Sequence, residues 1–270
     1  MVLLPAGALT TVDVRGGAPA TRDTAALDPK YGGREVPAIV LTGGSAYGLA
    51  AADGVLDWIG EDAVVPAAAL FDLGRGGDFR ARPSAATGRQ AAEAAVREVA
   101  QEVAQEVAQG NVGAGTGAVN ATLKGGVGTA STTLPDGTVV AAIAVLNAVG
   151  PSVDPDTGLP YGAAFGYPDE FPAEGHFPQN DPPPAAPFNT VIGVIATNAA
   201  LSPAENYRLA NAAQDGLALA VRPAHSLFDG DTIFSVTTAT TTADAGEVIA
   251  AGAAVFARAL AHGLFAAYQN

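Results

Sequence analysis

The fold of this chain is decided by the stretch Pro187-Phe188-Asn189-Thr190-Val191-Ile192-Gly193-Val194-Ile195-Ala196-Thr197-Asn198. A proline-rich connector, residues 181–187, runs into it, and prolines favour extended, exposed chain because they have no N–H to give to a sheet. The aliphatic, β-branched run over residues 191–195 predicts a buried strand. The simplest interpretation is a linker that enters a core strand.

A second interpretation concerns the junction between Asn189 and Thr190. A cut at this junction would make Thr190 the N-terminus of a second polypeptide. A threonine hydroxyl can then act as a hydrolase nucleophile, because its own α-amino group serves as the base. The junction is therefore either structural or a self-cleavage site, and the rest of the chain must decide between the two.

The composition indicates a compact, turn-rich protein. Its 270 residues suffice for one large domain or two small ones, 49% of them are hydrophobic and only 15% charged, and 33 glycines and 19 prolines supply turns. The formal net charge of -14 argues against nucleic acid or an anionic membrane as a partner, because both attract basic surfaces.

The content of cysteine and histidine limits the chemistry. With no cysteine there is neither a disulfide nor a thiolate nucleophile, and the three histidines lie far apart without metal-ligand spacing. We therefore expect no metal and no other cofactor. The N-terminus lacks the features of a signal peptide, and no apolar run approaches the roughly 20 residues of a membrane span, so the expected location is the cytoplasm.

Strands and helices alternate along the chain. A hairpin is predicted where residues 129–134 and 138–146 flank a Pro-Asp-Gly turn, and a capping box of Ser202 and Glu205 predicts a helix that runs to about Val221. Other strands are expected over residues 2–4, 10–14, 38–42, 64–71 (at an edge or with a late start because of Pro66) and 232–238, and other helices over residues 45–60, 83–109 and 243–268. This order predicts α+β or mixed α/β layers in which helices cover sheets.

Three local patterns have structural interpretations that we favour. The segment Gly110–Ala118 has half of a phosphate-binding loop, but Thr116-Gly117 stands where Lys-Ser/Thr is required, so close backbone packing is the better explanation. Ser45 lies in a partial nucleophile elbow in which Tyr47 occupies the second glycine position, and a helix N-cap accounts for it better. The Glu-Val-Ala-Gln repeat over residues 98–109 predicts a solvated helix face.

Seven blocks, in order along nearly the whole chain, resemble the P1 peptidase family. The blocks are Val40–Val55, Phe71–Gly74, Gly110–Ala118, Gly125–Ala130, Asn147–Gly150, Asn189–Gly193 and Phe228–Phe234. That family includes the D-aminopeptidase/esterase enzymes, the β-peptidyl aminopeptidases and the endo-type nylon-oligomer hydrolases. The resemblance implies an αββα four-layer sandwich and a single catalytic domain, residues 1–270, that cleaves itself into fragments 1–189 and 190–270. It also implies αβ units that form a homo-oligomer, often a tetramer.

The resemblance also implies the site residues. Thr190 is the nucleophile after cleavage at Asn189-Thr190, and Asn147 directs its amide at the oxyanion or at the nucleophile. Asp229 and Asp231 orient the Thr190 hydroxyl and ammonium. From the residues alone, Asn147 is equally well a strand-end asparagine bonded to its own turn, and the two aspartates an ordinary Asp-Gly-Asp turn.

One departure from the family pattern concerns a lysine. Family members commonly carry it about six residues after the Gly-Ala-Gly-Thr run, where this chain has Ala121-Thr122, and the nearest lysine is Lys124. Either Lys124 fills the role across a shortened loop or the role is unfilled, which leaves slow or absent self-cleavage open. Tyr47 and Phe71 are the expected substrate-binding residues, although Phe71 lacks the aromatic hydroxyl of the family.

The prediction is a self-processing, N-terminal-threonine amide hydrolase that acts on small peptides or polyamide oligomers through an acyl ester on Thr190. The alternative is an uncleaved, non-catalytic relative with a structural or binding role. Peptides with D-residues, β-peptides and aminohexanoate oligomers all remain open as substrates. The aromatic, proline-rich loop over residues 151–187 is hypothesised to form an apolar channel for such chains.

Overall fold

The computed structural model describes residues 1–60, 62–100, 107–175, 177–178 and 188–269. A six-stranded sheet has the order β4-β2-β12-β11-β10-β9, and a four-stranded sheet has the order β1-β5-β6-β3. Strands β11 and β12 are parallel, as are β5 and β6, and their other neighbours are antiparallel. The strands are β1 Val2–Leu3, β2 Leu9–Val14, β3 Ala20–Arg22, β4 Arg34–Glu35, β5 Ala38–Thr42, β6 Ala67–Ala69, β9 Gly126–Thr133, β10 Val139–Leu146, β11 Ile192–Ala199 and β12 Thr232–Thr241, with a separate small hairpin of β7 Val119–Asn120 and β8 Leu123–Lys124.

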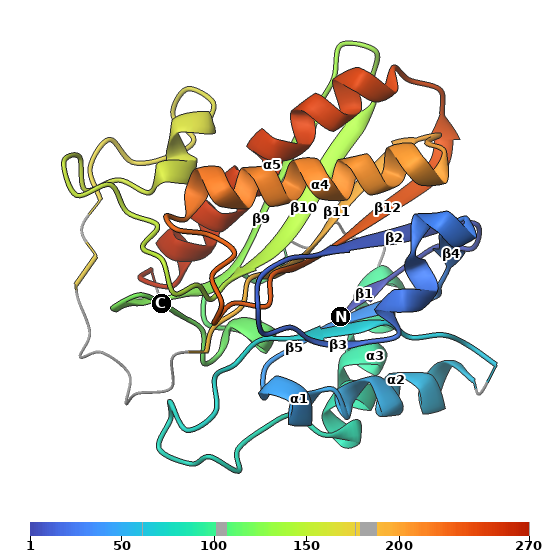
Figure 1. The fold of residues 1–270 in the computed structure, drawn as a ribbon, viewed down its shortest axis with the longest axis horizontal. Coiled ribbons are helices and arrows are strands. Elements are labelled where there is room, and N and C mark those ends of the chain that lie inside the picture. The colour runs from blue at the N-terminus through green and yellow to red at the C-terminus, as the bar shows by residue number, and fades with distance from the viewer. Residues whose placement is uncertain (61, 101–106, 176, 179–187, 270) are drawn as a thin grey trace.

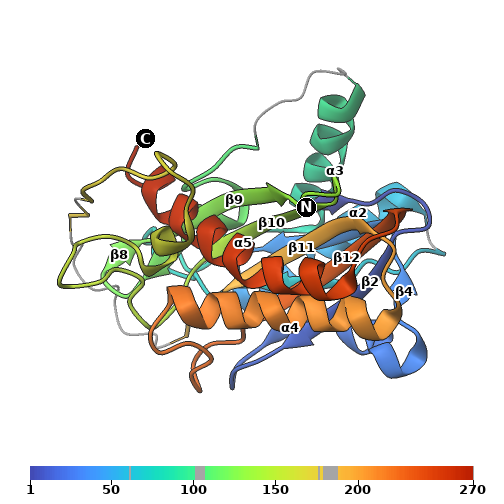
Figure 2. The same cartoon turned by 90° about the horizontal axis from the view of Figure 1, so that it is seen from above.

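The two sheets are stacked between two layers of helices (Figure 1). Helices α4 and α5 cover the outer face of the six-stranded sheet, and α1, α2 and α3 lie against the outer face of the four-stranded sheet. Seen from above, α4 and α5 run side by side across the strands (Figure 2). The bounds are α1 Ser45–Gly48, α2 Ala51–Ile59, α3 Ala85–Ala100, α4 Pro203–Ala220 and α5 Ala245–Ala266. The chain is thus an αββα four-layer sandwich, as predicted.

The alternation of side chains along each strand produces the layers. On β5, Ile39 and Leu41 pack between the two sheets, while Ala38 and Val40 face α2. On β11, Ile192 and Val194 join the core between the sheets, and the next residue, Ile195, joins the core under the helices. A strand with both faces covered reads as a continuous apolar run, which explains the pattern after Thr190.

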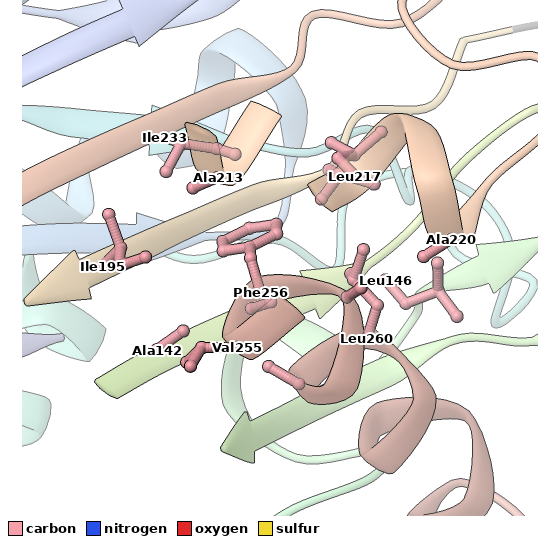
Figure 3. Close-up of a cluster of buried hydrophobic side chains, with 14 of the residues drawn as sticks. Ala142, Leu146, Ile195, Ala213, Leu217, Ala220, Ile233, Val255, Phe256 and Leu260 are labelled. Atoms are coloured by element: carbon pink, nitrogen blue, oxygen red, sulfur yellow. The ribbon is translucent and has the colours of Figure 1, made fainter. Parts of the chain in front are cut away.

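Phe256 of α5 lies at the centre of the core between the helices and the six-stranded sheet (Figure 3). Its fully buried ring is surrounded by Ile195 of β11, Leu217 of α4 and Leu260 of its own helix. Full burial of such side chains contributes about 2 kcal/mol each. This core holds β11 against the two long helices. It thereby fixes the position of Thr190, which lies two residues before the strand.

Most predicted elements are confirmed within a few residues. The hairpin forms as β9 and β10, and Ser202 caps α4 in a complete capping box with Glu205. Pro66 delays its strand until Ala67, but that strand lies inside the sheet between β5 and β3. The connector 181–187 and residues 101–106 of the Glu-Val-Ala-Gln repeat lie outside the described residues.

The helix predicted over residues 45–60 forms but is interrupted between Gly48 and Ala51, and its predicted cap is wrong. The chain forms two helices, α1 and α2, and Gly44, not Ser45, is the N-cap. Ser45 has a left-handed φ of 53° and its N–H donates to Leu70 O at 2.8 Å. The backbone turns sharply here, where the chain passes from β5 into α1.

Helix α5 has the length and composition of a membrane span, with a hydropathy of 1.7 over its most apolar window, contrary to the expectation that no apolar run approaches that length. In the fold 67% of that window is buried against α4 and the sheet. Its apolar residues therefore form the protein core.

Candidate active site

Three strand ends meet at one edge of the six-stranded sheet. In the register, Val145 of β10 pairs with Ile192 of β11, and Ile192 pairs with Thr232 of β12. The residues that follow β10 and those that precede β11 and β12 must therefore lie together. This edge carries Asn147, Thr190 and the segment Asp229-Gly230-Asp231, so the topology brings together most of the predicted site.

Thr190 is 2% exposed, and its hydroxyl both donates and accepts a hydrogen bond. The hydroxyl donates to the carbonyl oxygen of Asn189, the group that a cut at this junction must attack. The N–H of Gly230 donates to Thr190 Oγ1 at 3.0 Å. The N–H of Thr190 itself donates to Asn147 O at 2.6 Å. The Thr190 hydroxyl, the Asn189 carbonyl group and a hydrogen-bond donor to the hydroxyl are thus held in direct contact.

Asp229 and Asp231 hold the backbone on either side of Thr190 Oγ1. Asp231 Oδ1 accepts from Val191 N at 2.8 Å, and its Oδ2 accepts from the N–H of His225 and contacts His225 Nδ1 at 2.8 Å. Asp229 Oδ1 accepts from Val149 N at 3.2 Å. The two carboxylates therefore fix the Gly230 N–H that lies between them in the chain.

The environment of Asp229 raises the pKa of its carboxyl group. Each aspartate of the pair is only 1% exposed. Burial raises the pKa of Asp229 above its ordinary value, and the charge of Asp231 raises it further, while a hydrogen bond from Ser226 opposes both.

The carboxamide of Asn147 is fully buried and held at both ends. Its Oδ1 accepts from Arg75 Nη1 at 2.5 Å and from Val119 N at 3.0 Å. Its Nδ2 makes a longer bond, 3.4 Å, to Phe71 O. Asn147 thus contacts Thr190 through its main-chain oxygen. Its side-chain nitrogen, Nδ2, makes only a long and therefore weak hydrogen bond.

Arg75 is a site residue that the sequence analysis did not find. It lies in the loop after β6, and its guanidinium reaches Gly117 O at 3.1 Å, Phe188 O at 3.2 Å and Asn189 Oδ1 at 2.9 Å. Burial lowers the pKa of Arg75 to about 10, and Asp72 opposes that shift. A half-buried arginine bonded to Phe188 and Asn189 places a cation beside the Asn189-Thr190 junction.

The chain matches the model of Peptidase family S58 over residues 3–270. This chain belongs to peptidase family S58. An S58 relative, an uncharacterized aminopeptidase of Mycobacterium leprae, is 46% identical over 265 residues, which cover 90% of this chain and 72% of the relative. The 6-aminohexanoate-oligomer endohydrolase of Paenarthrobacter ureafaciens is 32% identical over 270 residues, covering 88% and 68%. The resemblance stated from the sequence is confirmed, and this S58 peptidase is an enzyme of the aminopeptidase or amidohydrolase type.

Two solved structures share the fold. A β-aminopeptidase of a Burkholderia species matches with a TM-score of 0.69 at 22% identity, over 96% of this chain and 74% of that chain. The L-aminopeptidase D-Ala-esterase/amidase of Ochrobactrum anthropi, described as a variant of the Ntn hydrolase fold, matches with a TM-score of 0.63 at 19% identity, over 96% and 73%. At these identities the likeness concerns the fold.

The glycine-rich segment of this S58 peptidase packs backbone against backbone, as the sequence analysis favoured. Gly110 exchanges two hydrogen bonds of 2.8 Å with Val127 of β9. A Cβ on Gly115 would lie 2.7 Å from Gly110 O. The close packing delivers the main-chain groups of Gly117 and Val119 to the site, where they bind Arg75, Asn147 and Asn189.

Lys124 and Tyr47 lie apart from the contacts of Thr190. Ala121-Thr122, at the position of the family lysine, form the turn between β7 and β8. Lys124 lies on the returning strand, with its ammonium 5.7 Å from the ring centre of Tyr268, and lines a cavity of about 480 Å³ together with Arg75. Tyr47 is 55% exposed and stacks on Arg82.

Phe71, in contrast, lies at the site. Its carbonyl oxygen accepts from Asn147 Nδ2, and its ring centre is 5.9 Å from that of Phe188. Phe188 is also 6.2 Å from Phe228, so three aromatic rings line the chain just before the junction. Of the two residues expected to bind substrate, Phe71 is therefore the one close to the Asn189-Thr190 junction.

Ser45 has the strand-to-helix turn of a nucleophile elbow but lacks the rest of that site. It lies after β5 as the first residue of α1, with a left-handed backbone. Of the two histidines in the described part of the chain, His225 contacts Asp231 and His262 contacts Glu170. Neither is bonded to Ser45, so this serine has no base among the described residues.

The described residues include no group of three or more histidine, aspartate or glutamate side chains placed to hold a metal ion. The polar groups around Thr190 are bonded to one another: Asp231 to Val191 and His225, and Asn147 to Arg75 and Val119. The chemistry that this arrangement supports is nucleophilic attack by a hydroxyl on a neighbouring amide carbonyl.

Proposed function

We propose that this S58 peptidase cuts its own chain between Asn189 and Thr190 and then hydrolyses peptides or amide oligomers through an ester on Thr190. The observation that carries the proposal is the contact of the buried Thr190 hydroxyl with the carbonyl oxygen of Asn189, while Gly230 N binds the same hydroxyl. A nucleophile already in contact with its target needs little reorganisation to reach the transition state.

In the first step Thr190 Oγ1 attacks the carbonyl carbon of Asn189. The C–N bond breaks, the acyl group moves to the oxygen, and the hydroxyl proton ends on the Thr190 nitrogen. Asn147 Nδ2 supplies a hydrogen bond to the oxyanion, a role suited to a neutral donor in a site without bulk water. Water then hydrolyses the ester, which leaves a carboxylate on Asn189 and a free amine on Thr190.

The mature enzyme uses that amine as its base. An α-amino group has an ordinary pKa of about 8, so near neutral pH it accepts the hydroxyl proton and returns it to the leaving amine. Asn147 O, 2.6 Å from the nitrogen in the intact chain, holds the amine, and Gly230 N holds the hydroxyl. Asp229 and Asp231 keep both in place through their bonds to the main chain at Val149 and Val191.

The substrates are short peptides or amide oligomers, in line with relatives named aminopeptidase and 6-aminohexanoate-oligomer endohydrolase. The cavity of about 480 Å³ is lined by Arg75 and Val119, the two residues that bind the Asn189 side chain, and we propose that it receives the substrate chain. We propose that the functional unit is an αβ pair of the two fragments and that such pairs form a homo-oligomer.

Intact-mass measurement of the purified protein tests the self-cleavage. Fragments 1–189 and 190–270 are expected, and Thr190→Ala must remain intact and inactive, with a loss of at least about 10³-fold on any amide substrate. Ser45→Ala is the matched control and keeps both properties. An intact wild-type chain that hydrolyses no D-residue peptide, β-peptide or aminohexanoate oligomer would instead indicate a non-catalytic relative.

A further inference from the structure

The side chain of Asn189 occupies a cradle that matches a carboxamide at both ends. Its oxygen, Oδ1, accepts from Arg75 Nη2 at 2.9 Å, and its nitrogen, Nδ2, donates to Val119 O at 3.0 Å. The residue is 8% exposed, and its own N–H donates to Phe228 O at 3.1 Å. One donor and one acceptor of the protein thus face one acceptor and one donor of the side chain.

The cradle is made of groups that the proposed cleavage leaves in place. Arg75 belongs to the loop after β6 and Val119 to strand β7, both far from the junction in sequence. The ester formed in the first step of self-cleavage joins an asparaginyl acyl group to Thr190 Oγ1. A peptide substrate with asparagine before its scissile bond forms the same ester on the same oxygen.

We propose that the acyl-side subsite of the mature enzyme takes an asparaginyl residue, held by Arg75 and Val119 O, so that the enzyme acts on peptides with asparagine immediately before the scissile amide. This inference rests on the proposed function and names its substrate class. A carbonyl group attacked by one nucleophile must occupy one place, and its side chain then falls in the cradle that Asn189 fills in the intact chain.

The chemistry of the cradle discriminates between side chains of similar shape. A carboxylate would pair with Arg75 but would bring its second oxygen against Val119 O, which is an acceptor. A leucine of about the same size would offer no acceptor to Arg75 Nη2 and no donor to Val119 O. Sites built to hydrogen-bond a substrate reject analogues without those groups far more strongly than apolar pockets reject analogues of another size.

The contacts of Phe188, the residue before Asn189, indicate that the acyl side also binds a longer chain. Phe188 lies with its ring 5.9 Å from that of Phe71 and 6.2 Å from that of Phe228, and Arg75 Nη2 also donates to Phe188 O at 3.2 Å. A substrate residue before the asparagine meets these same groups. The acyl side therefore accommodates an aromatic residue followed by asparagine, and the peptide continues beyond it.

The reaction on such a peptide balances without a further reagent. The Thr190 amine takes the hydroxyl proton as Oγ1 attacks the asparaginyl carbonyl, and the proton passes to the leaving peptide amine as the C–N bond breaks. Water then attacks the ester, releases the peptide with a C-terminal asparagine carboxylate and restores the hydroxyl. The sum is one amide and one water converted to one acid and one amine.

The test measures kcat/KM of the matured wild-type protein on N-acetylated peptides Ala-Phe-Xaa-Ala-Ala-amide in which Xaa is Asn, Asp, Leu or Ala. The expected result is a preference for Asn over each of the other three by about 10-fold or more. Equal rates for the four peptides, or a higher rate for Leu or Ala, would overturn the subsite and leave the amidase intact. Fragments that form but hydrolyse none of the four would overturn it as well.

Substitutions of Asn189 test the same cradle within the chain itself, because the Asn189 side chain occupies it before cleavage. Asn189→Leu and Asn189→Asp are each expected to slow the appearance of the fragments by about 10-fold or more relative to wild type, and Asn198→Leu, in β11 away from the junction, is the matched control. If both junction variants mature at the wild-type rate, the cradle does not recognise the acyl residue. If wild type itself never cleaves, the proposed function fails, and the two failures are told apart by intact mass.

Discussion

Arg75 Nη1 lies 2.5 Å from Asn147 Oδ1, and this contact determines which end of the Asn147 carboxamide faces the site as a donor. Because the Arg75 cation binds Asn147 Oδ1, the other end of the carboxamide, Nδ2, is directed away from it and donates to Phe71 O at 3.4 Å. A carboxamide turned end for end would present its oxygen, an acceptor, to a developing oxyanion. Arg75 is therefore a positioning residue for the amide that the proposed mechanism uses.

Replacement of Arg75 by methionine should slow self-cleavage by about 10²-fold, because misplacement of a catalytic group by as little as 1 Å has a cost of that size. The rate at which the 1–189 and 190–270 fragments appear is the measurement. Arg75→Lys, which keeps the charge without the planar fork, should recover part of the rate. Arg97→Met on α3 is the matched control; equal rates for both methionine variants would contradict the positioning role.

Gly193→Ala should destabilise the fold by about 1–3 kcal/mol. A Cβ at this position of β11 would lie 2.7 Å from the ring of Phe256 and 2.8 Å from Ile143 O, and neither the core ring nor the backbone can retreat freely. Urea denaturation in the Thr190→Ala background, where the chain stays in one piece, measures the free energy of unfolding. Gly76→Ala, with no atom within 4 Å of its Cβ, is the control and should be neutral.

The stability of the fold should depend on the protonation of Asp229. Burial raises the pKa of Asp229 in the folded chain above that of an unfolded aspartate, about 3.9. The stabilising effect of the proton is then complete below the unfolded pKa and is lost as the pH rises through the raised folded pKa. The ionised form is the costly one in this buried place.

Asp229→Asn removes that dependence, since a carboxamide has no proton to lose. In the Thr190→Ala background, the free energy of unfolding of Asp229→Asn minus that of the aspartate form should increase as the pH rises from 4 and then level off. Asp72, whose pKa burial also raises, is present in both chains and cancels in the difference. A difference that stays constant with pH would contradict the raised pKa.

Much of the site could be predicted from the sequence because it lies where strands end. Asn147 follows an apolar run, and Thr190 precedes one, as do Asp229 and Asp231, so local patterns and the family resemblance place them correctly at one sheet edge. Such residues depend on short-range signals: the end of an apolar period and a turn that follows.

Arg75 could not be found in this way. It lies in a loop rich in glycine and arginine, where Arg80 and Arg82 are equally plausible candidates. Its role depends on contacts with residues 42, 72 and 114 positions further along the chain. The left-handed Ser45 is a second case, because its N–H is bonded to Leu70 O in the neighbouring strand, which no pattern around Ser45 reveals.

Glu170→Gln should loosen the attachment of the loop before the junction to the helix after it. The Glu170 carboxylate accepts hydrogen bonds from Arg258 Nη2 at 2.6 Å, Arg258 Nε at 2.9 Å and Tyr167 N at 2.8 Å. It also contacts His262 Nε2 at 2.9 Å. Burial raises the pKa of Glu170, but these hydrogen bonds outweigh burial and lower it to about 2. Glu170 belongs to the 1–189 segment and Arg258 to α5 of the 190–270 segment, so this ion pair links the two proposed fragments.

Because the folded pKa of Glu170 lies below that of an unfolded glutamate, about 4.3, its stabilising effect is present above that value and is lost as the pH falls through about 2. The carboxylate is 13% exposed, and partial solvent screening leaves an expected loss of about 2 kcal/mol for Glu170→Gln at pH 7. Urea denaturation in the Thr190→Ala background should show this loss at pH 7, and a smaller one as the pH approaches 2. The exposed Glu174→Gln is the matched control, and a loss independent of pH would mean that Glu170 acts through packing alone.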